Sequence, residues 1–111
     1  MRTKAKRITE YLLCIPNDPD AASHFSGIRS VCPHKAVLYL TLHTGHGELL
    51  RQANAYASRY RLPVGILAAP GKFPRAKAMA MQAYRIAAKF PGGRVVCFDA
   101  AANSTEYQTK Y

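Results

Sequence analysis

The stretch VGILAAPGKFPRAKAMAMQAYRIAAKFPGGRVVCF, residues 64–98, decides the fold because it places a helical pattern between two apolar runs. The runs Val64 to Ala69 and Arg94 to Phe98 are short and continuously apolar, which is typical of strands covered on both faces. An amphipathic helix is predicted after Phe73-Pro74 and ends at Pro91-Gly92-Gly93. The predicted inward-facing positions of this helix are Ala76, Met79, Ala80, Ala83, Ile86, Ala87 and Phe90.

Outward from this stretch, the chain repeats the alternation of strands and helices. Two further apolar runs, Tyr11 to Ile15 and Ala36 to Leu42, predict strands. A second amphipathic pattern predicts a helix from about Gly47 to Tyr60. The residues Asp18-Pro19-Asp20 suit the start of a short helix that ends near Gly27. The predicted order is strand, helix, strand, helix, strand, helix, strand.

This order predicts an α/β fold, a small open parallel-rich four-stranded sheet with helices packed on it. The alternative is a ferredoxin-like α+β fold with antiparallel neighbours, because residues 16–35 need not contain a full crossover helix. Ligands of open α/β sheets bind beyond the carboxyl ends of the strands. In the predicted sheet, four loops meet there, at residues 16–20, 43–48, 70–74 and 99–104.

The length of 111 residues indicates a single domain with one hydrophobic core. We expect a basic N-terminal arm at residues 1–7, the α/β domain at residues 8–102 and a polar tail at residues 103–111. Apolar residues make up 49% of the chain, which argues against wholesale disorder. No apolar run is long enough for a membrane span, so no membrane partner is expected.

The cysteine pattern predicts reduced thiols and a cytoplasmic protein. Cys14, Cys32 and Cys97 are odd in number and show no paired spacing. Cys14 and Cys97 lie inside predicted strands, where a cysteine acts as a small hydrophobic residue.

Charge is the most unusual property of the sequence. Sixteen Lys and Arg residues against six Asp and Glu residues give a formal net charge of +10 at pH 7. No acidic residue occurs between Glu48 and Asp99. The cations in this interval are Arg51, Arg59, Arg61, Lys72, Arg75, Lys77, Arg85, Lys89 and Arg94. Since their mutual repulsion is uncompensated within the segment, we expect a surface that meets an anionic partner.

Two helices carry the predicted anion-binding residues. The start of the third helix carries three cations, Lys72, Arg75 and Lys77, where acidic residues are usually preferred. Free backbone N–H groups together with cations are suited to binding an anion. The outer sides of the helices add further cations at helical spacing. The complete predicted set for phosphates or nucleic acid is Arg51, Arg59, Lys72, Arg75, Lys77, Arg85 and Lys89.

No catalytic set is assigned from the sequence. His43 and His46 in a glycine-rich turn, and Asp99 after a strand, are candidates for acid/base chemistry. No cofactor and no metal are expected. The grouping of Cys32 and His34 with the two histidines is excluded, because the strand between them separates the pairs by about 30 Å.

The sequence predicts a small nucleic-acid-binding accessory protein that contacts phosphates with limited sequence specificity. One alternative is an interaction or inhibitor protein whose basic face docks on an acidic protein or on a nucleic-acid-binding complex. Another is an enzyme acting on a phosphoester, with His43 or His46 as base, Asp99 as acid or metal ligand, and Lys72 and Arg75 holding the phosphate. DNA versus RNA and the oligomeric state stay open.

Overall fold

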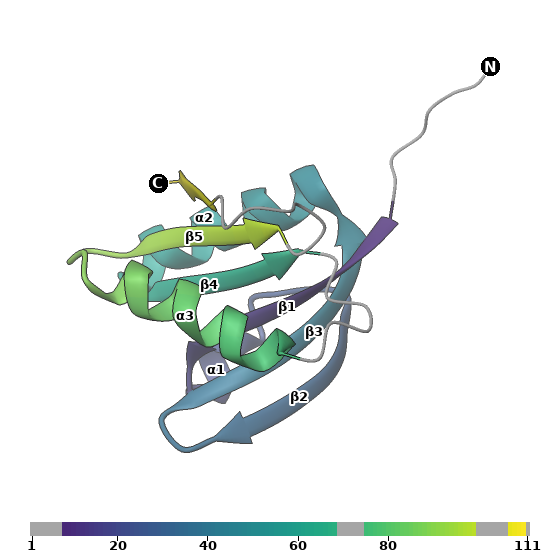
Figure 1. Ribbon diagram of the computed structural model, residues 1–111, viewed down its shortest axis with the longest axis horizontal. Helices are drawn as coiled ribbons and strands as arrows, with labels where there is room; N and C mark the ends of the chain where they lie inside the picture. The colour runs from purple at the N-terminus through teal and green to yellow at the C-terminus, as the bar shows by residue number, and fades with distance from the viewer. Residues whose placement is uncertain (1–7, 69–74, 100–106, 111) are drawn as a thin grey trace.

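The computed structural model describes residues 8–68, 75–99 and 107–110, which form a mixed sheet with helices on both of its faces (Figure 1). The strands are β1 (Ile8–Pro16), β2 (Ile28–His34), β3 (Val37–Gly45), β4 (Pro63–Ala68), β5 (Arg94–Asp99) and β6 (Tyr107–Lys110). The helices are α1 (Pro19–Ala22), α2 (His46–Tyr60) and α3 (Ala76–Ala88). The expected N-terminal arm, residues 1–7, lies outside the described residues, and β6 lies within the expected tail.

The sheet is mostly antiparallel, so the prediction of a parallel-rich four-stranded sheet was wrong in its detail. In the described residues six strands follow the order β2-β3-β1-β4-β5-β6. Only the β4–β5 pair is parallel. Continuous apolarity correctly indicated strands covered on both faces, but a mixed sheet between two helical layers produces the same pattern. The class is therefore α+β.

A short edge strand explains the difference in topology. β2 was not predicted, because five of its seven residues are exposed and it carries little apolar signal. A two-residue turn joins it to β3, with Lys35 in the left-handed region at φ 58°. The predicted first helix is also only one turn long, capped by Asp18, which accepts a hydrogen bond from the Ala21 N–H at 3.3 Å. The connectivity from β1 to β4 is thus βαββαβ, as in the antiparallel alternative.

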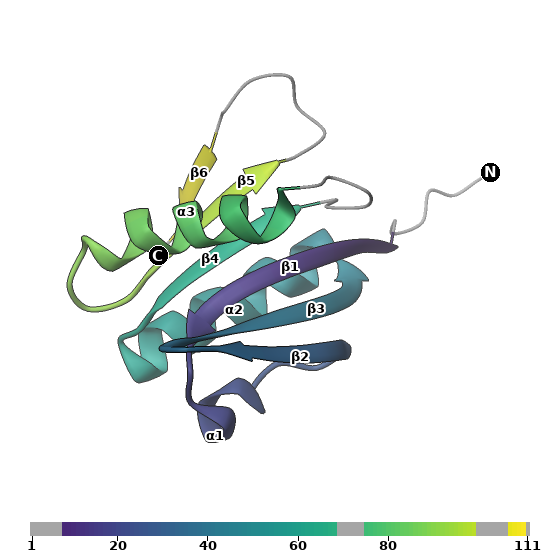
Figure 2. The ribbon, with the colours of Figure 1, turned by 60° about the horizontal axis from the view of Figure 1, so that its bottom comes forward.

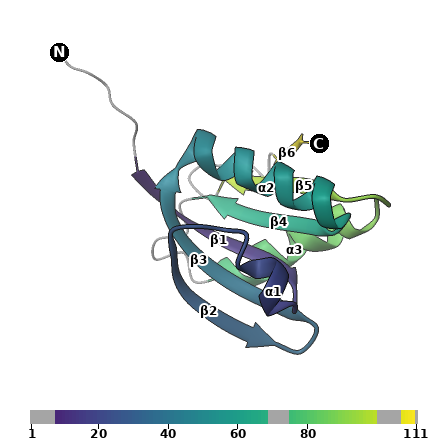
Figure 3. The same ribbon diagram turned by 180° about the vertical axis from the view of Figure 1, so that it is seen from behind.

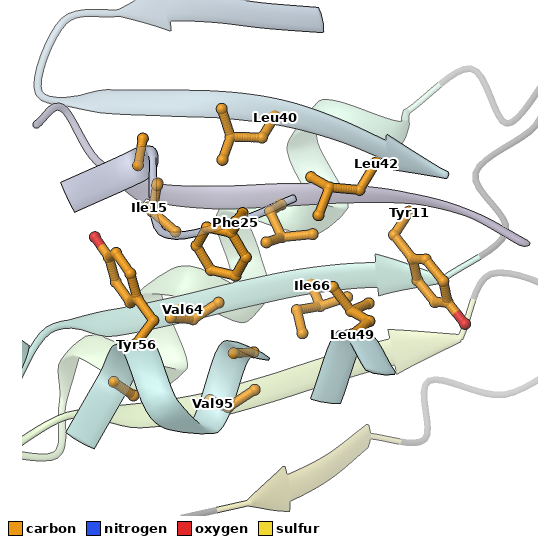
Figure 4. Close-up of a cluster of buried hydrophobic side chains, with 14 of the residues drawn as sticks. Tyr11, Ile15, Phe25, Leu40, Leu42, Leu49, Tyr56, Val64, Ile66 and Val95 are labelled. Atoms are coloured by element: carbon orange, nitrogen blue, oxygen red, sulfur yellow. The ribbon is translucent and has the colours of Figure 1, made fainter. Parts of the chain in front are cut away.

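The helices divide the sheet into two faces, which we call the α2 face and the α3 face after the helix that packs on each (Figures 2 and 3). The core of the α2 face lies between the sheet, α1 and α2 (Figure 4). Its largest fully buried side chains include Tyr11, Leu13, Ile15, Leu40, Leu42, Leu49, Tyr56 and Ile66. Gln52 is buried in the same layer; its amide donates to Ser26 Oγ at 2.8 Å and its oxygen accepts from Ser26 N–H at 3.0 Å.

The core of the α3 face is built from small residues on the helix. Ala80, Ala83 and Ala87 are fully buried against strand residues that include Leu12, Cys14, Tyr39, Leu67, Val96 and Phe98. Gly65 on β4 allows this close approach, because a Cβ atom there would lie 2.3 Å from Tyr84 N. Phe90, expected to face inward, is 41% exposed and lies under the Arg94 guanidinium, with the ring centroid 4.0 Å from Cζ.

Strand direction determines which loops meet. β3 and β4 both run antiparallel to β1, and β5 runs parallel to β4, so β3, β4 and β5 end at the same end of the sheet. Three of the four predicted loops therefore begin at this end, although residues 69–74 and 100–106 lie outside the described residues. The loop at residues 16–20 lies at the opposite end, which corrects the prediction for it. Within the described residues, no helix is long and apolar enough to cross a membrane.

Candidate functional site

The exposed side of α3 carries four cations. Arg75 at the N-cap position, Lys77, Arg85 and Lys89 at the C-cap position are all exposed. The sequence of α3 contains no acidic residue, so the helix itself provides no compensating charge. The structure thus places these four predicted anion-binding residues on one helix, while Lys72 lies outside the described residues.

Two of these cations lie beside the strands of the sheet. The Lys77 ammonium is 5.6 Å from the Tyr39 ring centroid and 3.5 Å from Cys32 Sγ. Burial raises the pKa of the Cys14 thiol to about 12, and the Arg85 charge opposes this shift. The same charge opposes the rise that burial causes in the pKa of Tyr39. Lys77 and Arg85 therefore lie close enough to β1 and β3 for their charges to interact with Cys14 and Tyr39.

α3 covers only part of its face. The helix packs on β4, β5 and β1, and β3 and β2 continue beyond it (Figure 2). On this outer part lies an open depression of about 460 Å³, lined by Glu10, Arg29, Thr41 and His43. These four side chains come from three adjacent strands, β1, β3 and β2.

Strand pairing explains how the depression is built. Glu10 on β1 lies directly opposite His43 on β3, so their side chains share a face of the sheet. On the other side of β3, Arg29 Nη1 lies 3.5 Å from His43 Nδ1. The pairing of β2 with β3 shifts between Ile28 and Ser30, which is a β-bulge at Arg29. Because a bulge re-aims the side chain of its extra residue, it places Arg29 next to His43.

The cations of α2 lie on the other face of the sheet. Arg51 donates to the Glu48 carboxylate through Nε, at 3.1 Å, and through Nη2. The guanidinium of Arg59 lies 5.5 Å from the Tyr60 ring centroid. The predicted anion-binding set is therefore divided between two faces rather than gathered on one surface. The expectation that charge in this segment is uncompensated was wrong for Arg51, because Glu48 lies one helical turn away and pairs with it.

The catalytic candidates are separated by the sheet. The His46 imidazole Nδ1 lies 3.0 Å from the Tyr11 hydroxyl, whose ring belongs to the core of the α2 face. Val95 and Cys97 of β5 belong to the same core, and side chains alternate along a strand, so the Asp99 side chain lies on this side as well. His43, adjacent in register to Glu10, points to the α3 face. The structure therefore does not bring His43 together with His46 and Asp99.

Metal-ligating side chains are spread along β2 and β3. Cys32 and His34 pair with Tyr39 and Val37, whereas His43 lies near the far end of β3. Among the described residues, no group of three or more His, Cys, Asp or Glu side chains is placed to hold a metal ion.

Three residues of the depression, Glu10, Arg29 and Thr41, were not predicted from the sequence as site residues. Glu10 has a weak signal, since it precedes the apolar run that predicted β1. Arg29 has none, because its position depends on an unpredicted strand and on a bulge within it. Comparisons with protein-family models, with curated proteins and with solved structures find no match for this chain, so the site is interpreted from its own geometry.

Proposed function

We propose that this chain is a small basic nucleic-acid-binding protein that holds phosphates on its α3 face. The observation on which the proposal rests is that Arg75, Lys77, Arg85 and Lys89 are all exposed on a helix without acidic residues. Like charges on one helix repel each other and lower its stability slightly. A phosphate backbone removes this repulsion and releases its own counterions, which is the main source of affinity for nucleic acids.

The surroundings of α3 support an extended contact. Lys77 lies beside Tyr39 on β3 and Cys32 on β2, and Arg29 and His43 lie further along the same two strands. Cationic side chains are therefore present both on the helix and on the outer strands of the α3 face. We call Arg29, Arg75, Lys77, Arg85 and Lys89 the α3 cationic surface. Long cationic side chains contact phosphates without reading bases, so most of this surface contributes limited sequence specificity. A cytoplasmic site of action fits the three cysteines, none of which forms a disulfide.

The α2 face provides the matched comparison. Arg51 and Arg59 are exposed cations like Lys77 and Arg85, but they lie across the sheet, and Arg51 is paired with Glu48. The proposal therefore uses only one of the two helices that the sequence suggested. Removing two charges from either helix leaves the same net charge and changes only where the remaining charge lies.

Fluorescence anisotropy with labelled single-stranded and duplex oligonucleotides tests the proposal. We expect wild-type binding to weaken steeply between about 50 mM and about 200 mM salt. The variant K77Q/R85Q should bind more weakly, with a salt slope smaller by about 1 to 2, because two phosphate contacts are lost. The control variant R51Q/R59Q should retain most of the affinity and the slope.

Two results would contradict the proposal. One is the absence of binding to any nucleic acid at low salt; the other is equal weakening by both variants, which would show that only net charge matters. Co-purification with an acidic protein after nuclease treatment, together with the first result, would support the interaction-protein alternative instead.

A further inference from the structure

We infer that the depression lined by Glu10, Arg29, Thr41 and His43 is a pocket for one unpaired guanine base, so that the nucleic-acid partner is single-stranded. This inference rests on the proposed function and adds a specific site to it. The depression is concave, with a volume of about 460 Å³. A recess of this kind receives a base that is splayed out of a single strand, whereas a duplex groove is read by an element that protrudes into it.

The carboxylate in the depression indicates that its ligand is a base rather than a phosphate. Glu10 is exposed and lines the depression together with the Arg29 guanidinium and the His43 imidazole. A site for phosphate alone is disfavoured by a carboxylate, because the two anions repel each other. A base offers N–H groups instead, and a carboxylate accepts hydrogen bonds from them. The mixed charge of the lining therefore points to a base.

The arrangement of donors and acceptors favours guanine. Two adjacent carboxylate oxygens match two adjacent donors, and among the bases guanine alone presents such a pair, N1–H and the N2 amino group, on its Watson–Crick edge. Its O6 and N7 atoms accept from an arginine in the most common specific contact with this base. Glu10 on β1 and Arg29 on β2 flank β3, so their backbones lie about 10 Å apart. A purine with hydrogen bonds at both edges spans such a distance.

His43 supplies a stacking surface between the two charged residues. It is exposed, lies opposite Glu10 in register and contacts Arg29. Flat rings such as imidazole stack on the faces of unpaired bases. The single-stranded nucleic acid that carries this base then continues over Lys77 and Arg85, which bind its phosphates.

The experiment compares single strands of matched length that differ in one central base, either guanine or adenine, in an otherwise thymine-only sequence. Wild-type protein should bind the guanine strand at least about tenfold more tightly, as expected for one bidentate contact. E10Q should abolish this preference by lowering the affinity for the guanine strand. Its affinity for the adenine strand should equal or exceed that of wild type, because a charge that repels the phosphates is removed. The control variant D20N removes an exposed carboxylate on α1 and should leave the preference unchanged.

The outcomes separate the inference from the proposed function. Equal wild-type affinity for both strands, or an equal gain for both strands in E10Q, would overturn the guanine pocket and leave phosphate binding standing. Equally tight binding of duplex and single strand would also overturn it. A failure to bind any strand at low salt would overturn both. R29Q gives an independent check, since it should lower the affinity for the guanine strand more than the affinity for the adenine strand.

Discussion

At the scale of single residues, the alternation of side chains along β1 and β3 decides which surface is charged. Glu10 and His43 face α3, whereas the neighbouring Tyr11 and Leu42 are buried on the α2 face. Because side chains alternate with a period of two, a one-residue slip would exchange these sets. The register of β1 with β3, and the bulge at Arg29, therefore build the depression.

Two buried thiols make the free energy of unfolding decrease at alkaline pH. Burial raises the pKa of Cys14 to about 12 and that of Cys97 to about 11, from an ordinary value of 9.0. The unfolded chain loses these protons first, so the stabilisation is complete below about pH 9 and is lost as the pH rises through the folded pKa values. In this range each thiol lowers the free energy of unfolding by up to about 1.4 kcal/mol per pH unit.

Denaturant unfolding under reducing conditions at about pH 8 and about pH 10 measures this effect. We expect wild type to lose stability over this interval, and the variant C14A/C97A to lose less, even though its cavities lower stability at both pH values. Identical losses in the two proteins would show that the thiols are not the source. Burial also raises the pKa values of Tyr11, Tyr56 and Tyr84, and these tyrosines act in the same direction in both proteins.

At the scale of elements, the position of α3 depends on the absence of side chains beneath it. Three buried alanines on the helix meet β4, where Gly65 has no Cβ atom. A Cβ atom at this position would lie 2.6 Å from Tyr84 Cα and 2.7 Å from the Ala80 carbonyl oxygen, which are backbone atoms and cannot rotate away. The cations of α3 are therefore fixed in height above the sheet by this contact.

The substitution G65A should lower the free energy of unfolding by about 1 to 3 kcal/mol, because α3 must shift away from β4. The control G47A lies in α2, where a Cβ atom would meet nothing within 4 Å, and should be neutral or stabilising by up to about 1 kcal/mol. Chemical denaturation measures both. Equal stability of G65A and wild type would contradict the close packing of α3 on β4.

The elements differ in how far the sequence predicts them. The long helices α2 and α3 and the strands β1, β3, β4 and β5 were predicted, because each has a strong apolar pattern or periodicity. β2 was missed because an edge strand buries few side chains, and Ile28 and Val31, its aliphatic residues, are partly or largely exposed. The first helix was predicted too long, since the cap at Asp18 is genuine but only one turn follows.

The site was predicted in part for a related reason. The cations of α3 follow from sequence alone, since charge and helical spacing are both local. The connections between the elements determine that α2 and α3 lie on opposite faces of the sheet. The amphipathic pattern of a helix shows which side of it is buried but does not show on which face of the sheet it packs. The depression depends on three strands meeting in one register, so Glu10 and Arg29 become neighbours of His43 only in the folded sheet.

At the scale of the whole molecule, the sheet separates two basic surfaces that the sequence presents as one. The α2 face buries the larger core and carries cations that interact within their own helix, as Arg51 does with Glu48. The α3 face carries the exposed cations of the helix and the open depression on β1, β3 and β2. We therefore expect a nucleic acid to bind only the second of these surfaces.

Backbone amide NMR during titration with a single-stranded oligonucleotide tests this claim most directly, because it reports the contact surface residue by residue. We predict saturable shift changes at Arg29, His43, Lys77 and Arg85, and changes near zero at Arg51 and Arg59 on the opposite face. Shift changes of equal size on α2 and α3, or changes confined to α2, would contradict the account.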